Sequence, residues 1–132
     1  MNRKWIKQDE KAHCCGQIAV AVIANITLEE SIKLIGKKGG TSTKELVKAL
    51  KKLGYKCPYN KCKRMPVKPK LGLGQLHRLG YSGWHWIAID GDKIYDGLKG
   101  NPDGTVNWNS DWRITSYLPV YEKKNKWKYY LY

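Results

Sequence analysis

The chain has 132 residues, with 25 Lys or Arg against 11 Asp or Glu, which gives a formal net charge of +14. This charge favours a polyanionic partner, either nucleic acid or an acidic protein, although a solvated lysine-rich surface explains the charge equally well. No apolar run reaches membrane-spanning length and no secretion signal is recognisable, so we expect a cytoplasmic protein with reduced thiols and no membrane partner. The length suits one domain, and residues 1–132 are expected to form a single unit.

The apolar run CCGQIAVAVIAN, residues 14–25, predicts the first helix of the chain. Its many small alanines argue against a strand, and its larger aliphatic residues recur at helical spacing. Because the run begins with Cys14 and Cys15, both cysteines are expected at the N-terminus of a buried helix.

Two further helices are predicted, and both carry a start signal. Thr27 followed by Glu30 forms a capping box for a helix that ends at Gly36, and Ser42 followed by Glu45 forms a second capping box. The helix after the second box carries a leucine stripe and ends before a glycine suited to the left-handed conformation of a helix C-terminus. These local signals predict three consecutive helices in the N-terminal half.

The C-terminal half is predicted to consist mainly of strands. Residues 55–70 are basic and interrupted by prolines, which favours a short strand and an irregular connection, while the glycines in residues 71–80 favour a short helix or a loop. Alternation over residues 84–90 is the clearest strand signal, and further strands are expected between residues 105 and 132. Helices first and strands afterwards indicate an α+β fold, with N-terminal helices packed on a C-terminal antiparallel sheet.

A hairpin is predicted after the clearest strand, because Asp90-Gly91 is a preferred turn sequence and a further strand signal follows it. A turn centred near Gly91 pairs residues whose numbers sum to about 181, which places Asp96 across from His85. A carboxylate in that position could hold the imidazole in one tautomer through its second ring nitrogen.

Cys15 is the candidate nucleophile. The unpaired N–H groups and the partial positive charge of a helix N-terminus favour the thiolate and lower the pKa of a thiol. Gly16 removes side-chain bulk beside the sulfur, so a scissile carbonyl could approach closely and Gly16 is a candidate substrate contact. His85 would act as the base, and the side-chain amide of Gln8 could donate to the oxyanion together with the N–H of the nucleophile.

These residues, in this order, resemble the papain-like peptidases that remove double-glycine leaders from bacteriocins, and the small stand-alone relatives of that family. Gln8 followed by HCCGQIAVAVIAN is similar to the first motif of the family, GTSTKELVKALKKLGY to the helix that follows it, and GWHWIAIDGDKIYDG to its second motif. The resemblance covers residues 5–98 and implies a papain-like fold.

The same resemblance implies an activity and a set of site residues. A triad of Cys15, His85 and Asp96, with Gln8 at the oxyanion, would hydrolyse a peptide or isopeptide bond through a thioester, after glycine or another small residue. A peptide or protein substrate would enter a narrow slot, and the two tryptophans beside His85 would flank it as further substrate contacts; these are Trp84 and Trp86.

The identity of the nucleophile stays open between two neighbours. In the family, the glutamine stands six positions before the nucleophile, and that spacing from Gln8 selects Cys14. The Cys-Gly pair selects Cys15, which is preferred because Gly16 and the helix follow it. Cys14 remains the alternative nucleophile.

A binding module is the alternative function. On that interpretation the papain-like shell has lost catalysis, and its basic, aromatic surface binds nucleic acid or an acidic protein, for example as an inhibitor of a host system. Cys57 and Cys62 could join Cys14 and Cys15 in a metal site, but adjacent cysteine ligands are unusual, so no metal and no cofactor are expected.

Overall fold

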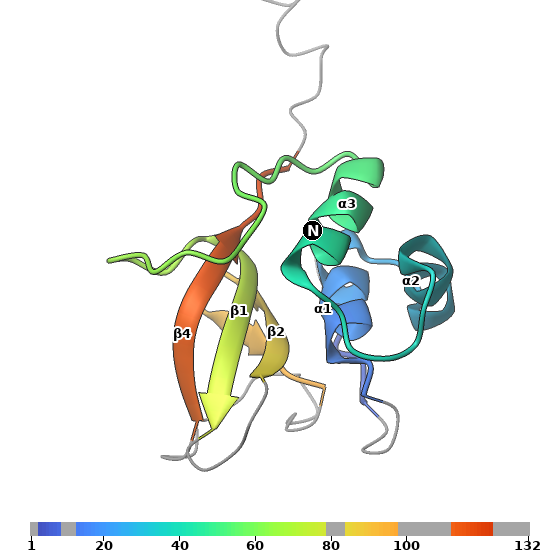
Figure 1. Ribbon diagram of the computed structural model, residues 1–132, viewed down its shortest axis with the longest axis horizontal. Coiled ribbons are helices and arrows are strands. Elements are labelled where there is room, and N and C mark those ends of the chain that lie inside the picture. The colour runs from blue at the N-terminus through green and yellow to red at the C-terminus, as the bar shows by residue number, and fades with distance from the viewer. Residues whose placement is uncertain (1–2, 9–12, 79–83, 98–111, 123–132) are drawn as a thin grey trace, which may run out of the picture.

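The computed structural model of the protein describes residues 3–8, 13–78, 84–97 and 112–122 (Figure 1). Three helices come first in these residues, namely α1 (Cys15–Ala24), α2 (Leu28–Ile35) and α3 (Thr43–Lys52), and four strands follow, namely β1 (Leu71–Arg78), β2 (Trp84–Asp90), β3 (Lys93–Tyr95) and β4 (Trp112–Pro119). The predicted α+β class, with the helices N-terminal to an antiparallel sheet, is confirmed for this part of the chain.

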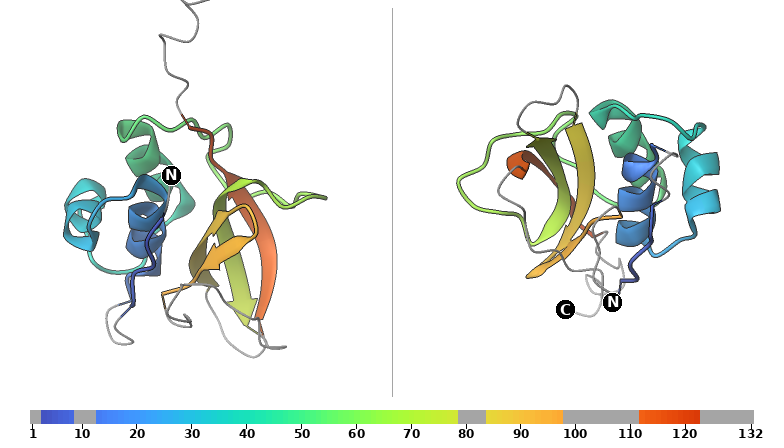
Figure 2. Two further views of the ribbon diagram at one scale, coloured as in Figure 1. Left: turned by 180° about the vertical axis from the view of Figure 1, so that it is seen from behind. Right: turned by 90° about the horizontal axis from the view of Figure 1, so that it is seen from below.

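The strands form one sheet in the order β3-β2-β1-β4, with every neighbouring pair antiparallel. Figure 2 shows the three helices on one side of this sheet, with α1 between the sheet and α2. Because α1 has neighbours on both sides, all of its residues from Gly16 to Ile23 are buried. A helix that is apolar all round is stable only in such an interior position.

The core has two parts, one on each face of the sheet. Between the helices and the sheet, α1 and α3 pack against alternate strand residues that include Trp86 and Ala88. On the other face, Leu76, Ile87 and Ile89 form a smaller cluster. The alternation along β2 therefore divides its side chains between two apolar environments, which explains why the strand lacks a polar face.

The helix boundaries follow the predicted signals. Thr27 and Glu30 form the capping box of α2, and Ser42 and Glu45 form that of α3. Gly36 takes the left-handed conformation at the end of α2, with φ of 92°. The three predicted helices are confirmed, because their start and stop signals are local and do not depend on the rest of the fold.

The prediction of a short helix or a loop at residues 71–80 is wrong, because β1 lies there and pairs with both β2 and β4. Its glycines are needed for close packing in the middle of the sheet. A Cβ atom at Gly72 would lie 2.5 Å from the backbone oxygen of Leu118, and one at Gly74 would lie 2.9 Å from side-chain atoms of Ile87. Glycine therefore occupies positions 72 and 74 although its intrinsic propensity for strands is poor.

The β2–β3 hairpin is confirmed, but its predicted register is wrong by two. Ala88 pairs with Tyr95 and Asp90 pairs with Lys93, so Gly91 and Asp92 make the turn and not Asp90 and Gly91. Gly91 has φ of 60°, which a two-residue turn of this kind requires at its first position. When this register is continued one residue beyond β3, Asp96 lies opposite residue 87. Residues 85 and 87 share a face of β2, so Asp96 is a diagonal neighbour of His85 on that face.

Two of the expected strand regions are only partly described. Residues 55–70 form no named strand and contribute two isolated bridges to β4 and its end, at Lys56 with Tyr121 and at Lys63 with Tyr117. The strands expected at residues 105–108 and 126–132 lie outside the described residues. No helix in the described part is long and apolar enough to cross a membrane.

Arg3 ties the start of the chain to three distant elements. Its guanidinium donates to Asp90 at 2.7 Å, to Glu122 at 3.0 Å and to the carbonyl oxygen of Ile23 at 3.1 Å. Its side chain is only 3% exposed. The residue thus joins the end of α1 to the ends of β2 and β4.

We expect Arg3→Ala to lower the free energy of unfolding by about 2 kcal/mol, because it removes three charge-assisted contacts and leaves the Ile23 carbonyl oxygen without this donor. Urea denaturation would measure the loss. Lys4→Ala is the matched control, since the Lys4 side chain is exposed. Equal unfolding midpoints for the two variants would contradict the structural role of Arg3.

Candidate active site

Cys15 is the first residue of α1, and Cys14 is its N-cap. The Cys14 side chain is 3% exposed and packs in the helix–sheet core. The Cys15 side chain is half-buried, and the backbone N–H groups of Trp86 and Gly16 are among the causes that lower the pKa of its thiol. Of the two adjacent cysteines, Cys15 is therefore the one whose side chain reaches solvent.

His85 and Asp96 form a buried pair beside that sulfur. The Nε2 atom of His85 donates to Oδ1 of Asp96 at 2.6 Å, and both side chains are almost completely buried. The imidazole is also hydrogen-bonded to the Cys15 thiol, for which its other nitrogen, Nδ1, remains. The structure thus brings Cys15, His85 and Asp96 into one chain of contacts.

The electrostatic interactions among these three residues favour a charged pair of Cys15 and His85. Burial lowers the pKa of His85, but the hydrogen bonds and charges of Asp96 and Cys15 outweigh it and raise that pKa to about 9. Burial raises the pKa of Cys15, but the His85 hydrogen bond and charge, together with the two backbone donors, lower it overall. Opposite shifts of this kind favour a thiolate next to an imidazolium.

The N-terminal segment holds Asp96 in place. The indole N–H of Trp5 donates to the carbonyl oxygen of Asp96 at 2.8 Å, and the backbone N–H of Gln8 donates to that of Gly97 at 2.8 Å. A Cβ atom at Gly97 would lie 2.9 Å from the Gln8 Cβ, so the two segments touch directly. Trp5 was not among the predicted site residues, and its separation of 91 positions from Asp96 explains why no local pattern indicates it.

Gln8 therefore lies next to the acid of the candidate triad. Its side chain is 5% exposed, and its Oε1 atom is buried without a hydrogen-bond partner in the described residues. This oxygen is an acceptor, whereas stabilising an oxyanion would require the NH₂ end of the same amide. The predicted oxyanion role of Gln8 remains a proposal.

Gly16 packs against the protein interior, next to Thr41 and Leu46. A Cβ atom there would lie 2.0 Å from Oγ1 of Thr41 and 3.2 Å from the Leu46 side chain. The loop that carries Thr41 is fixed by Gln17, whose Nε2 donates to the carbonyl oxygens of Lys37 and Gly39 at 2.9 and 2.8 Å. The lack of a side chain at Gly16 thus lets this loop pack against the start of α1, and its backbone N–H faces the Cys15 sulfur.

The two tryptophans beside His85 have different environments. Trp86 is 2% exposed in the core, so the prediction that its side chain flanks a substrate is wrong, and it serves the site through its backbone N–H. Trp84 is 52% exposed and packs against His77, with ring centroids 5.9 Å apart. The two tryptophans share a face of β2, and Trp84 is the exposed one, placed for contact with a ligand.

The remaining cysteines lie apart from this site. Burial raises the pKa of the Cys57 thiol, and it also raises the pKa of the Cys62 thiol. None of the four cysteines is in a disulfide, and no group of His, Cys, Asp or Glu within the described ranges is arranged to hold a metal ion. Cys15, in contrast to Cys57 and Cys62, has its pKa lowered by its surroundings, which favours the reactive thiolate.

Comparison with known proteins adds no further assignment. No family model matches the chain, and no curated protein matches its sequence. Any function must therefore be argued from the residues and contacts described above.

Proposed function

We propose that the protein is a papain-like cysteine peptidase that hydrolyses a peptide or isopeptide bond after glycine or another small residue. The observation that carries the proposal is the buried contact chain from Cys15 through His85 to Asp96, with the pKa of the thiol lowered and that of the imidazole raised. A buried cysteine with a structural role needs no such pairing.

The first half of the reaction forms a thioester. The Cys15 thiolate attacks the carbonyl carbon of the scissile bond, and the carbonyl oxygen takes the negative charge. The side-chain amide of Gln8 and the backbone N–H of Cys15 would donate to this oxyanion. His85, protonated at Nδ1, gives its proton to the departing amine while Asp96 stabilises its orientation.

The second half releases the product. His85 is now neutral and takes a proton from a water molecule, which attacks the thioester carbonyl. The carbon–sulfur bond breaks, the new carboxylic acid leaves and loses its proton to solvent, and the proton on His85 restores the imidazolium beside the Cys15 thiolate. Trp84, exposed next to His85, offers an apolar surface for the chain of the substrate.

Selective alkylation tests the reactive thiol directly. At pH 6–7 we expect iodoacetamide to label Cys15 at least about tenfold faster than Cys14, Cys57 or Cys62, because the pKa of Cys15 is lowered while burial shields or deactivates the others. Peptide mass spectrometry after timed labelling gives the four rates. Slow, uniform labelling of all four cysteines would contradict the proposal.

The pH dependence of turnover provides a second readout of the same pair. Activity should rise on the acid side as Cys15 ionises, at a pH below the ordinary thiol value of about 8.5. It should fall on the alkaline side as His85 loses its proton, near pH 9. A fluorogenic peptide ending in Gly-Gly-aminocoumarin is a suitable substrate, and an alkaline limb near pH 6.5 would rule out the charged pair.

A further inference from the structure

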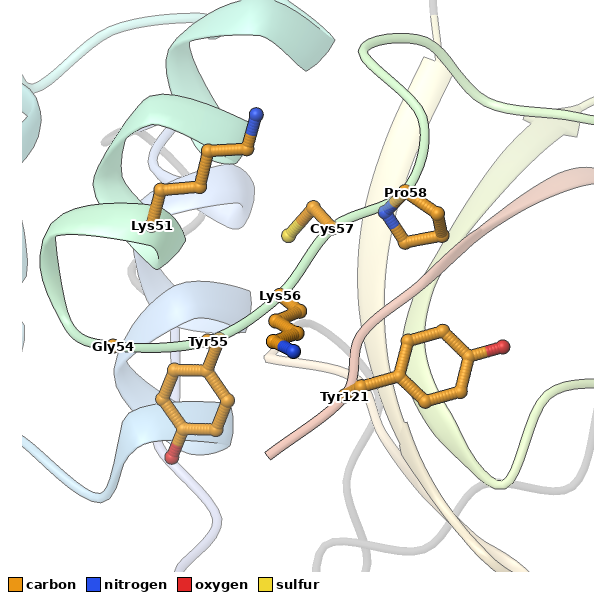
Figure 3. A pocket seen from close by; sticks show the side chains of 7 residues that line it. All are labelled: Lys51, Gly54, Tyr55, Lys56, Cys57, Pro58 and Tyr121. Carbon is orange, nitrogen blue, oxygen red and sulfur yellow. The ribbon is translucent and has the colours of Figure 1, made fainter. Parts of the chain in front are cut away.

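A second candidate site lies at the far end of α1 from Cys15. A cavity of about 550 Å³ is lined on one side by Lys51 and Tyr55 at the end of α3, and on the other by Pro58 and Tyr121 (Figure 3). The hydroxyl of Tyr55 donates to the carbonyl oxygen of Ile23, near the C-terminus of α1. At 1.5 Å per residue, that end of the helix is about 12 Å from Cys15, so the cavity is separate from the triad.

A row of lysines leads away from this cavity along α3. Lys44, Lys48, Lys51 and Lys52 recur at helical spacing and are exposed on one face of the helix. They line a second hollow of about 510 Å³, which shares Lys51 with the first. None of the four lysines forms an ion pair with a described residue, and neither hollow has an acidic residue in its lining.

Exposed aromatic rings accompany these charges. Tyr121 is 56% exposed at the edge of the first hollow, and Tyr59, which is 40% exposed, comes in sequence between lining residues of the two hollows. The ammonium group of Lys63 lies 5.5 Å from the centre of the Tyr59 ring. Of the three exposed aromatic side chains in the described part, Tyr121 lines the first hollow with Lys51, and Tyr59 lies beside Lys63.

We propose that this surface binds single-stranded nucleic acid, with phosphates along the lysine row of α3 and a base stacked on Tyr121 over the first hollow. Lysines supply the charge that a phosphate backbone requires, and exposed tyrosines supply the flat apolar contact that an unpaired base requires. An acidic peptide would use the lysines but would leave the exposed rings without a matching planar group. The proposal does not depend on hydrolysis, because no triad residue takes part.

Tyr121 allows the stacking contribution to be tested without disturbing the fold. Its backbone makes two hydrogen bonds with Lys56, each 2.8 Å long, and its side chain points outward. Tyr121→Ala should therefore keep the strand end in place and lower affinity for a single-stranded oligonucleotide about tenfold or more. Trp84→Ala removes a similarly exposed ring elsewhere and should leave oligonucleotide affinity unchanged.

The lysine row is tested by fluorescence anisotropy with a labelled oligo(dT) of about 20 nucleotides, titrated at several salt concentrations. Lys44→Gln/Lys48→Gln/Lys51→Gln should weaken binding more than tenfold and reduce the slope of log affinity against log salt by about 2. The control variant carries the same three Lys→Gln changes at exposed lysines away from α3, namely Lys33, Lys38 and Lys93. It loses the same charge and should weaken oligo(dT) binding less than threefold. Urea midpoints of all variants establish that they are folded.

Four outcomes would overturn the proposal. The first is an affinity for a duplex of the same length equal to that for oligo(dT), and the second is an equal loss of oligo(dT) affinity in the two triple variants. The third is tighter binding of poly-glutamate than of oligo(dT), and the fourth is no binding of oligo(dT) in about 50 mM salt. Cys15→Ser should bind oligo(dT) as the unchanged protein does. Loss of hydrolysis with retained oligonucleotide binding thus separates this surface from the candidate active site.

Discussion

Replacing Cys15 with alanine should lower hydrolysis of the Gly-Gly-aminocoumarin peptide by about 10³-fold or more, because it removes the thiol whose pKa is lowered by His85. Fast labelling by iodoacetamide should disappear in the same variant. The fold should be retained, since Cys15 is only half-buried and alanine suits the first turn of a helix.

Cys14→Ala is the matched control, one residue away. Cys14 lies in the core, so its replacement should cost about 1 kcal/mol of stability while leaving the rate of hydrolysis within about threefold at a temperature where the variant is folded. This pair of variants decides between the two neighbours that the sequence leaves open. Full activity in Cys15→Ala together with loss in Cys14→Ala would transfer the nucleophile to Cys14.

Asp96→Asn should reduce hydrolysis by about 10³-fold or more while keeping the shape of the side chain. Burial by itself lowers the pKa of His85, and the hydrogen bond of Asp96 is the largest of the effects that raise it, with the charge of Asp96 adding to it. Without the carboxylate the pKa of His85 should fall from about 9, and the pKa of Cys15 should rise as its cationic partner is lost.

The measurement that isolates this effect is the pH dependence of Cys15 labelling. In Asp96→Asn the midpoint of labelling should move to higher pH, and the rate at pH 6–7 should drop about tenfold or more. Asp92→Asn, an exposed substitution in the neighbouring turn, is the control and should change neither quantity. An unchanged labelling midpoint in Asp96→Asn would mean that Asp96 does not govern the charge of His85.

The elements that could be predicted from the sequence are those specified by nearby residues. Thr27 with Glu30 and Ser42 with Glu45 each complete a capping box within four residues, so two helix starts need no information from the rest of the fold. The alternation from Trp84 to Asp90 likewise defines β2 by itself. Cys15 and His85 were found because each lies on an element of this kind.

The features that could not be predicted depend on distant contacts. β1 was missed because its glycines have poor strand propensity, and the reason for them is the approach of Leu118 and Ile87 from neighbouring strands. The hairpin register was wrong because φ of 60° at Gly91 sets the turn one residue later. The burial of Trp86 and the contacts of Arg3 depend likewise on partners far away in the sequence.

The residues that activate the thiol come from both halves of the chain. Cys15 stands at the start of α1, whereas His85 and Asp96 belong to the hairpin some seventy residues later. A chain that ends before residue 85 lacks the imidazole and the Trp86 N–H, which are among the causes that lower the pKa of Cys15. The lowered pKa of this thiol is therefore a property of the assembled helix–hairpin pair and not of α1 alone.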